Sequence, residues 1–147
     1  LRWARCDIKS VMLLPACLAK DEAKRAGAKE AWFTDADGFV TEGASSNAWI
    51  VTASGTLVTR ALDYKILGGV TRATLLDCAT AEGLTIEQRP FTVTEAYGSR
   101  EAFITSASNT VMPVIAIDGR PVADGRPGPL TARLRTQFHR SAEFSAL

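Results

Sequence analysis

Two side chains that could do chemistry lie in the first third of the chain, a lysine and a glutamate. Lys9 stands in Arg5-Cys6-Asp7-Ile8-Lys9-Ser10, and its amine could attack a carbonyl carbon or move a proton. Glu42 stands in Thr41-Glu42-Gly43-Ala44-Ser45-Ser46-Asn47, where its carboxylate could hold a positive charge in place. Residue type and spacing leave a second interpretation open for both, because most lysines and glutamates simply face water.

A third feature is a glycine pair in front of a predicted helix. In Ile66-Leu67-Gly68-Gly69-Val70-Thr71-Arg72 the glycines precede the apolar pattern of the helix. A helix N-terminus presents free N–H groups and a partial positive charge, which together can bind a phosphate. The loop in Phe103-Ile104-Thr105-Ser106-Ala107-Ser108 is a second candidate for the same phosphate. Glycine pairs are also common in loops, so the motif by itself identifies no ligand.

The residues around these motifs predict an irregular succession of strands and helices. Residues 1–10 predict a strand, and a helix follows from Pro15 to a stop at Gly27. We expect this helix to pack against a sheet through an apolar face made of Leu14, Leu18, Ala19, Ala23 and Ala26. The predicted strands are a hairpin over Phe33–Val40 with its turn at Asp37-Gly38, and single strands over 56–59, 84–89, 101–105 and 111–117. Turns are expected at Ser54-Gly55 and Asp118-Gly119, and a loop over 124–129. A second helix is predicted from an N-cap at Thr71 to Gly83, and a final helix carries Leu130, Leu134 and Phe138 on one face.

Composition and element order restrict the class of protein. A chain of 147 residues with 46% apolar and 22% charged residues is an ordinary globular mixture, expected to form one domain. The elements show no βαβ repetition, so the predicted class is α+β. A formal net charge of +1 gives no reason to expect a nucleic acid or an anionic membrane as partner. No apolar run reaches the ~18 residues of a membrane span, and no signal peptide is recognisable.

Cysteine, histidine and tryptophan suggest structural roles. Three cysteines without a close pair, and the single histidine, predict neither a metal site nor a disulfide framework, and a reducing cytoplasm is the expected location. Cys6 is expected to be a buried small apolar residue, and His139 to face solvent. The tryptophans Trp3, Trp32 and Trp49 are expected in the core or an interface.

Four blocks of the sequence, in the same order, resemble one enzyme family. The run Val40–Ile50 closely resembles the signature of class IV (fold-type IV) pyridoxal-phosphate aminotransferases. The run Arg2–Ser10, followed by Leu13-Leu14-Pro15, resembles the Schiff-base lysine segment of the D-amino-acid aminotransferase branch. The blocks at 66–72 and 103–108 match as well, so the resemblance extends from residue 1 to about Arg135.

The resemblance implies pyridoxal 5'-phosphate as cofactor and assigns roles to particular residues. Lys9 would form the Schiff base and then move the substrate's α-proton, while Glu42 would pair with the pyridine nitrogen. Arg2 would orient Glu42. The other implied cofactor contacts are Leu67 on the ring, and Val70, Thr71, Ser106 and Ala107 at the phosphate. At about Ala107 the D-amino-acid branch is expected to carry threonine, so backbone N–H groups would replace that hydroxyl here.

The resemblance also implies a fold, a reaction and partners. The fold would be a barrel-like mixed sheet surrounded by helices, and residues 1–147 would be the C-terminal domain of a homodimeric enzyme whose small N-terminal domain lies upstream. The reaction would transfer an amino group from a D-amino acid such as D-alanine to a 2-oxo acid such as 2-oxoglutarate. Four alternatives remain open: a branched-chain aminotransferase, an (R)-amine transaminase, an aminodeoxychorismate lyase, and a non-catalytic fragment that retains the motifs.

Overall fold

The computed structural model describes residues 4–144, with side chains described up to Ser141. The helices and strands follow one another in the order α1 (Leu14–Arg25), β1 (Trp32–Thr34), β2 (Phe39–Gly43), β3 (Asn47–Val51), β4 (Leu57–Thr59), α2 (Val70–Ala81), β5 (Ile86–Gln88), β6 (Phe91–Thr92), α3 (Val93–Tyr97), β7 (Glu101–Ser106), β8 (Thr110–Val114), β9 (Ala116–Ile117), β10 (Arg120–Pro121) and α4 (Pro129–Phe144). This mixture confirms the predicted α+β class.

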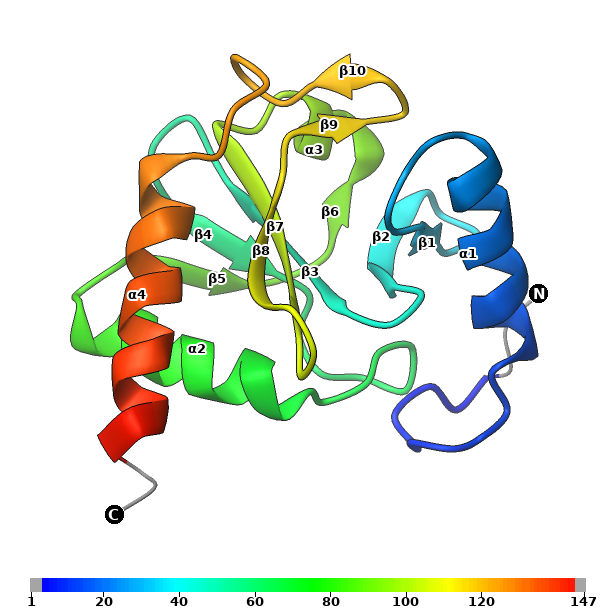
Figure 1. Ribbon diagram of the computed structural model, residues 1–147, viewed down its shortest axis with the longest axis horizontal. Coiled ribbons are helices and arrows are strands. Elements are labelled where there is room, and N and C mark those ends of the chain that lie inside the picture. Colours follow the sequence, from blue (N-terminus) through cyan, green and yellow to red (C-terminus); the bar gives the residue numbers. More distant parts are fainter. Residues whose placement is uncertain (1–3, 145–147) are drawn as a thin grey trace.

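A five-stranded sheet with β3 at its centre forms the frame of the molecule. Its order is β5-β4-β3-β7-β8, and β3 pairs antiparallel with both β4 and β7. Every residue of β3 is buried, because both faces of the sheet are covered. Ala48 and Ile50 join a core on the side of β2 and β6, while Trp49 and Val51 pack on the side of α2 and α4 (Figure 1). Alternation along the strand thus supplies both cores.

A smaller sheet, of order β1-β2-β6, meets the large one at a sharp corner. The β1–β2 hairpin is closed by Gly38, at φ 81°, and by Asp35, whose Oδ1 accepts a hydrogen bond from Phe39 N at 3.0 Å. After β2 the chain turns at once into β3, where Gly43 N donates to Ser46 O at 2.7 Å. The large sheet ends at β5 and β8, so the described strands close no complete barrel.

The predicted strand over residues 1–10 is wrong where the structure describes it. Residues 4–10 form turns and irregular backbone, and Trp3 and Arg2 lie outside the described part of the chain. A strand needs a neighbour that pairs with its backbone N–H and C=O groups, and residues 4–10 belong to none of the sheets.

Helix α1 has the predicted bounds but not the predicted burial. Gly27, at φ 77°, follows its end as expected. None of its residues is buried, and Leu14 and Leu18 of the predicted apolar face remain 69% and 61% exposed, so the expected burial of these two leucines is wrong, whereas Ala19 and Ala23 are half-buried. The helix lies at the edge of the molecule on the side opposite α4 (Figure 1). Periodicity defines an apolar face but does not specify what covers it.

Three further differences concern the start of one helix, an additional helix and a divided strand. Gly69, rather than Thr71, is the N-cap of α2, and Thr71 lies inside the first turn. The short helix α3 was not predicted, although Thr92 and Glu95 form a capping box at its start. The predicted strand over 111–117 is divided into β8 and β9. Within residues 4–144, no helix combines the length and apolar character needed to cross a membrane.

Candidate active site

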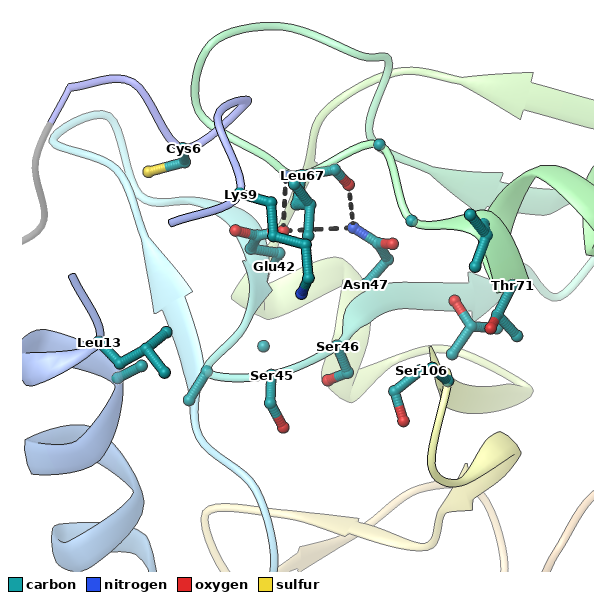
Figure 2. Close-up of a pocket in the computed structure, with 18 of the residues that line it drawn as sticks. Cys6, Lys9, Leu13, Glu42, Ser45, Ser46, Asn47, Leu67, Thr71 and Ser106 are labelled. Atoms are coloured by element: carbon teal, nitrogen blue, oxygen red, sulfur yellow. Dashed lines mark hydrogen bonds between the residues drawn. The ribbon is translucent and has the colours of Figure 1, made fainter. Parts of the chain in front are cut away.

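One cavity of about 590 Å³ collects the motifs that are far apart in the sequence. We call it the Lys9 pocket. Its walls are the segment before α1, the corner between β2 and β3, the start of α2 and the turn between β7 and β8 (Figure 2). All seven residues predicted to contact a cofactor line it: Lys9, Glu42, Leu67, Val70, Thr71, Ser106 and Ala107.

Glu42 is a buried carboxylate with an oriented oxygen. Its side chain stands at the end of β2, and the residue is 5% exposed. Oε2 accepts a hydrogen bond from Leu67 N at 2.8 Å and another from Asn47 Nδ2 at 3.2 Å (Figure 2). Two donors on one oxygen, a backbone amide and a side-chain amide, fix the direction of the group.

Asn47 is a site residue that sequence reasoning missed. Besides its bond to Glu42, Nδ2 donates to Leu67 O at 2.8 Å, so both polar groups of Leu67 are engaged in the site. Asn47 begins β3 immediately after the corner, which brings it beside Glu42 although the two strands belong to different sheets. Only the sharpness of that corner, indicated by the small residues between the two strands, could have suggested the pair.

Lys9 extends into the same pocket from an exposed, irregular segment (Figure 2). The segment is tied to the protein at Cys6, which is buried as predicted and whose N donates to Tyr64 O at 2.8 Å. Beside it Arg5 and Asp7 form an ion pair of 2.7 Å, and their hydrogen bond lowers the pKa of Asp7 and raises the pKa of Arg5. An amine on such a segment stays accessible to a bound molecule.

The start of α2 presents an anion-binding end to the pocket. Its N-cap is Gly69, and no side chain caps the helix. The first N–H groups of a helix have no acceptor within it, and the helix dipole adds a partial positive charge. Val70, 76% exposed, and the buried Thr71 both line the pocket here, together with Ser106 of the turn between β7 and β8. This arrangement suits a phosphate.

Glu30 organises the loop at the corner, a role that no sequence pattern indicated. Its Oε2 accepts hydrogen bonds from Ser45 N at 3.3 Å, Ser45 Oγ at 3.1 Å and Ser46 Oγ at 3.0 Å. A Cβ at Gly43 would collide with Ser46 Oγ, so any larger residue there would displace the hydroxyl that donates to Glu30. Glu30 lies fifteen residues from Ser45, beyond any local pattern.

The groups in the Lys9 pocket fit pyridoxal phosphate. That cofactor needs an amine for its aldehyde, a charge partner for its ring nitrogen and a cradle for its phosphate. Lys9, Glu42 and the uncapped start of α2 are those three groups, and they share one cavity. Among residues 4–144 no cluster of His, Cys, Asp and Glu could hold a metal ion, and His139 is exposed as predicted. Trp49 lies in the core as predicted.

Comparison with known proteins identifies the same family. The sequence pattern of the family described as Amino-transferase class IV matches residues 1–117. The D-alanine aminotransferase of Bacillus licheniformis is 40% identical over 141 residues, which are 96% of this chain and 49% of that protein. The D-alanine aminotransferase of Staphylococcus aureus (strain COL) is 38% identical over 147 residues, 100% of this chain and 51% of that protein.

Solved structures agree at the level of the fold. The branched-chain amino acid aminotransferase of Thermobaculum terrenum, in its PLP form, superposes with a TM-score of 0.88 at 32% identity, covering 93% of this chain and 45% of that one. The enzyme of Escherichia coli gives 0.83 at 27% identity over 95% of this chain and 49% of that one. The chain spans about half the length of these relatives. By the pattern matched over residues 1–117 and by its fold, the chain belongs to the class IV aminotransferase family.

Proposed function

We propose that the chain is the cofactor-binding, C-terminal domain of a pyridoxal-phosphate-dependent aminotransferase. The observation that carries this proposal is the convergence of Lys9, Glu42 and the uncapped start of α2 on one cavity. No two of these groups are neighbours in the sequence, so their meeting is a product of the fold. Membership of the family supports the same cofactor.

Each residue would have a separable task. The cofactor, when bound, supplies an electron sink for the bond that is broken at the substrate's α-carbon. Lys9 would attach covalently to its aldehyde carbon and, once displaced, would carry the α-proton on Nζ. Glu42 would hold a proton on the ring nitrogen, helped by Asn47 and Leu67 N–H. The residues that would position ring and phosphate are Leu67, Val70, Thr71, Ser106 and Ala107.

The proposed substrates are a D-amino acid of the D-alanine type and a 2-oxo acid such as 2-oxoglutarate. Relatives called D-alanine aminotransferase are 38% to 41% identical to this chain. A branched-chain aminotransferase is the second candidate, because solved enzymes of that name superpose with TM-scores up to 0.88. The Lys9 pocket is built of groups that serve either substrate class.

The complete enzyme is proposed to contain an additional N-terminal domain, to form a homodimer and to work in the cytoplasm. The curated relatives are about twice as long as this chain, which supports the additional domain. Exposed apolar side chains before and on α1, such as Met12, Leu14 and Leu18, support a covering surface from another domain or a second copy.

The test has two parts. Borohydride reduction of the cofactor-loaded protein, followed by peptide mapping, should place the pyridoxyl group on Lys9; label on Lys20, Lys24, Lys29 or Lys65 would contradict the assignment. The enzyme should then be assayed with D-alanine and with L-leucine as donors to 2-oxoglutarate. Preference for D-alanine supports the proposal, whereas preference for L-leucine selects the branched-chain candidate.

A further inference from the structure

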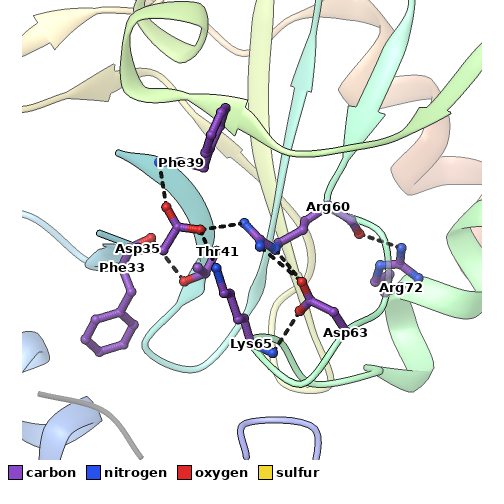
Figure 3. Close-up of polar contacts among 8 residues, drawn as sticks. All are labelled: Phe33, Asp35, Phe39, Thr41, Arg60, Asp63, Lys65 and Arg72. Carbon is purple, nitrogen blue, oxygen red and sulfur yellow. Dashed lines mark hydrogen bonds and ion pairs between the residues drawn. The ribbon is translucent and has the colours of Figure 1, made fainter. Parts of the chain in front are cut away.

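A cluster of four charged side chains outside the Lys9 pocket joins the β1–β2 hairpin to the loop between β4 and α2. We call residues 60–69 the β4–α2 loop. Asp35 Oδ2, on the hairpin, accepts hydrogen bonds from Arg60 Nη1 at 3.2 Å and from Lys65 Nζ at 3.0 Å (Figure 3). Asp63 Oδ2 accepts from Arg60 Nε and Nη2 at 3.1 and 3.0 Å. Two cations therefore face two carboxylates.

The pair at the centre of this cluster is buried. The side chains of Arg60 and Asp35 are only 6% and 9% exposed, and that of Lys65 is 31% exposed. Burial acts against the charged carboxylate, but hydrogen bonds from Lys65 and Phe39 N, with the charges of Lys65 and Arg60, hold the pKa of Asp35 below its usual value. Ion pairs taken out of water add little net stability, yet breaking one leaves an uncompensated buried charge. The buried ion pairs of Asp35 therefore restrict how the hairpin and the β4–α2 loop can be placed against each other.

The β4–α2 loop connects this charged cluster to the proposed cofactor site. Lys65 is two residues before Leu67, and its own N donates to Asp63 Oδ1 at 2.8 Å, which shapes the loop between them. Leu67 N is the donor on Glu42. Strand β2 starts beside Asp35 and ends at Gly43, next to Glu42. The hairpin therefore contacts the β4–α2 loop at both ends of this strand, through Asp35 with Lys65 and through Glu42 with Leu67 N.

Both ends of the loop, Arg60 and Gly69, are connected to α2. Arg72 Nη2 donates to Arg60 O at 2.8 Å, and burial lowers the pKa of this guanidinium. Gly69, the last residue of the loop, is the N-cap of α2. A shift of the loop would therefore disturb the Leu67 donor and the start of the helix together.

We propose that Asp35 is a positioning residue of the cofactor site, which keeps the Leu67 N–H on the Glu42 carboxylate by holding Arg60 and Lys65. Asp35 does not line the Lys9 pocket, so it acts through the loop. The inference rests on the proposed function for the role of Glu42. Its structural part, the coupling from Asp35 to Leu67, can be measured without cofactor.

The first test compares Asp35→Asn with Asp37→Asn, a matched control in the same turn whose side chain is exposed. Amide hydrogen exchange is measured on the cofactor-free protein. In Asp35→Asn the Leu67 amide should exchange about ten-fold faster or more, while Ile50 and Phe103 in the large sheet keep their rates. Asp37→Asn should change none of them. Equal acceleration of all amides, or an unchanged Leu67 amide, would overturn the proposal.

A milder variant keeps the proposal testable if Asp35→Asn fails to fold. Lys65→Met removes one of the two cations from Asp35 and leaves Arg60 in place. It should accelerate exchange at Leu67 in the same direction by a smaller factor. Lys24→Met, exposed on α1, should leave that amide unchanged. An unaltered Leu67 amide in a folded Lys65→Met protein counts against the coupling.

The second test uses pyridoxal phosphate itself. Asp35→Asn should weaken its binding about ten-fold in the parent protein, and by a clearly smaller factor when Glu42 is already Gln, because Asp35 acts through the partner of Glu42. If Asp35→Asn weakened binding by the same factor in both backgrounds, Asp35 would contribute only to the stability of the fold and the proposal would be wrong. If the parent protein bound no pyridoxal phosphate, the proposed function would fail, while the exchange experiment would still decide the coupling.

Discussion

At the scale of single residues, the peptide unit of Leu67 connects the parts of the pocket. Its N–H donates to Glu42 and its C=O accepts from Asn47, at 2.8 Å in each case. Asn47 in turn donates to Glu42, which closes a triangle of hydrogen bonds. Buried polar groups that are all satisfied have one preferred arrangement, so the carboxylate is held ready before a ligand arrives.

Glu42→Gln tests the charge of this triangle. A neutral amide keeps the shape but no longer holds a positive ring nitrogen, so attachment at Lys9 should persist while turnover falls. Loss of a charge-assisted contact of ~1.5–3 kcal/mol corresponds to a roughly ten- to hundred-fold lower kcat. Steady-state kinetics of the complete enzyme measures this, with the exposed Glu87→Gln on β5 as control. Unchanged turnover would make Glu42 an ordinary carboxylate.

Gly69→Ala tests the position of Asn47. Gly69 has an extended backbone, φ −66° and ψ 136°, that alanine tolerates, but its Cβ would lie 2.5 Å from Asn47 Oδ1. Asn47 would have to move and would lose its bonds to Glu42 and Leu67 O, so pyridoxal phosphate should bind about ten-fold more weakly. Gly68→Ala, whose Cβ would meet only Leu62 at 3.7 Å, should lose less. Equal losses, measured by cofactor titration, would contradict this account.

At the scale of the elements, side chains from distant segments fix the helices that cover the sheet behind the site. Helix α4, which covers the large sheet together with α2, is capped by Glu101 of β7. Oε1 accepts from Leu130 N at 3.0 Å, and Oε2 accepts from Thr131 N and Thr131 Oγ1 at 2.8 and 2.7 Å. A carboxylate at a helix N-terminus also interacts favourably with the helix dipole.

Glu101→Gln should therefore destabilise the fold without touching the pocket. The amide NH₂ of glutamine would face an N–H donor, which leaves a buried group unsatisfied at a cost of about 1–3 kcal/mol in the free energy of unfolding. Urea denaturation measures this value. Glu87→Gln should stay within about 0.5 kcal/mol of the parent protein. If the two variants were equally stable, the cap would contribute nothing.

The attachment of the hairpin to the β4–α2 loop should depend on pH with a definite sign. Because the pKa of Asp35 is lowered on folding, its stabilising contribution is present above its unfolded pKa and is lost as pH falls through the folded value. The difference in unfolding free energy between the parent protein and Asp35→Asn should be constant at neutral pH and shrink only below about pH 4. Urea denaturation at several pH values checks this. A difference that already shrinks near pH 6 would indicate a raised pKa.

At the scale of the whole molecule, the Lys9 pocket is open to solvent on the side of Lys9. Lys9 is exposed, and large apolar side chains beside it remain in contact with solvent, including Val11 at 92% and Met12 at 70% exposure. Water in a catalytic cleft weakens the charge interactions on which the proposed chemistry depends. The upstream domain that we propose, which the greater length of the relatives supports, would cover this side.

Residues 1–147 expressed alone should consequently bind pyridoxal phosphate but transfer amino groups poorly. The measurement is turnover of D-alanine with 2-oxoglutarate by this chain, with and without its proposed upstream domain. We expect the longer protein to be at least about a hundred-fold faster, since several kcal/mol of transition-state stabilisation depend on a closed site. Full activity of residues 1–147 would show that such a domain is dispensable.

The sequence by itself determined the local features and the identities of the chemical groups. Gly38 and Gly27 stand at the turn and the helix end that were predicted, because positive φ angles favour glycine. Helices α2 and α4 follow their apolar patterns. The seven predicted contact residues were selected by a family resemblance, and the structure gathers them in one cavity.

The tertiary structure alone decided which groups meet. The strand predicted over residues 1–10 pairs with no other strand from residue 4 onward, and Leu14 and Leu18 on the apolar face of α1 remain exposed. Glu30 and Asn47 reach the site, and Asp35 reaches the β4–α2 loop, through contacts between segments that no local pattern links. Periodicity and residue type report preferences over a few positions, whereas these contacts depend on how two sheets meet at a corner, which the whole core determines.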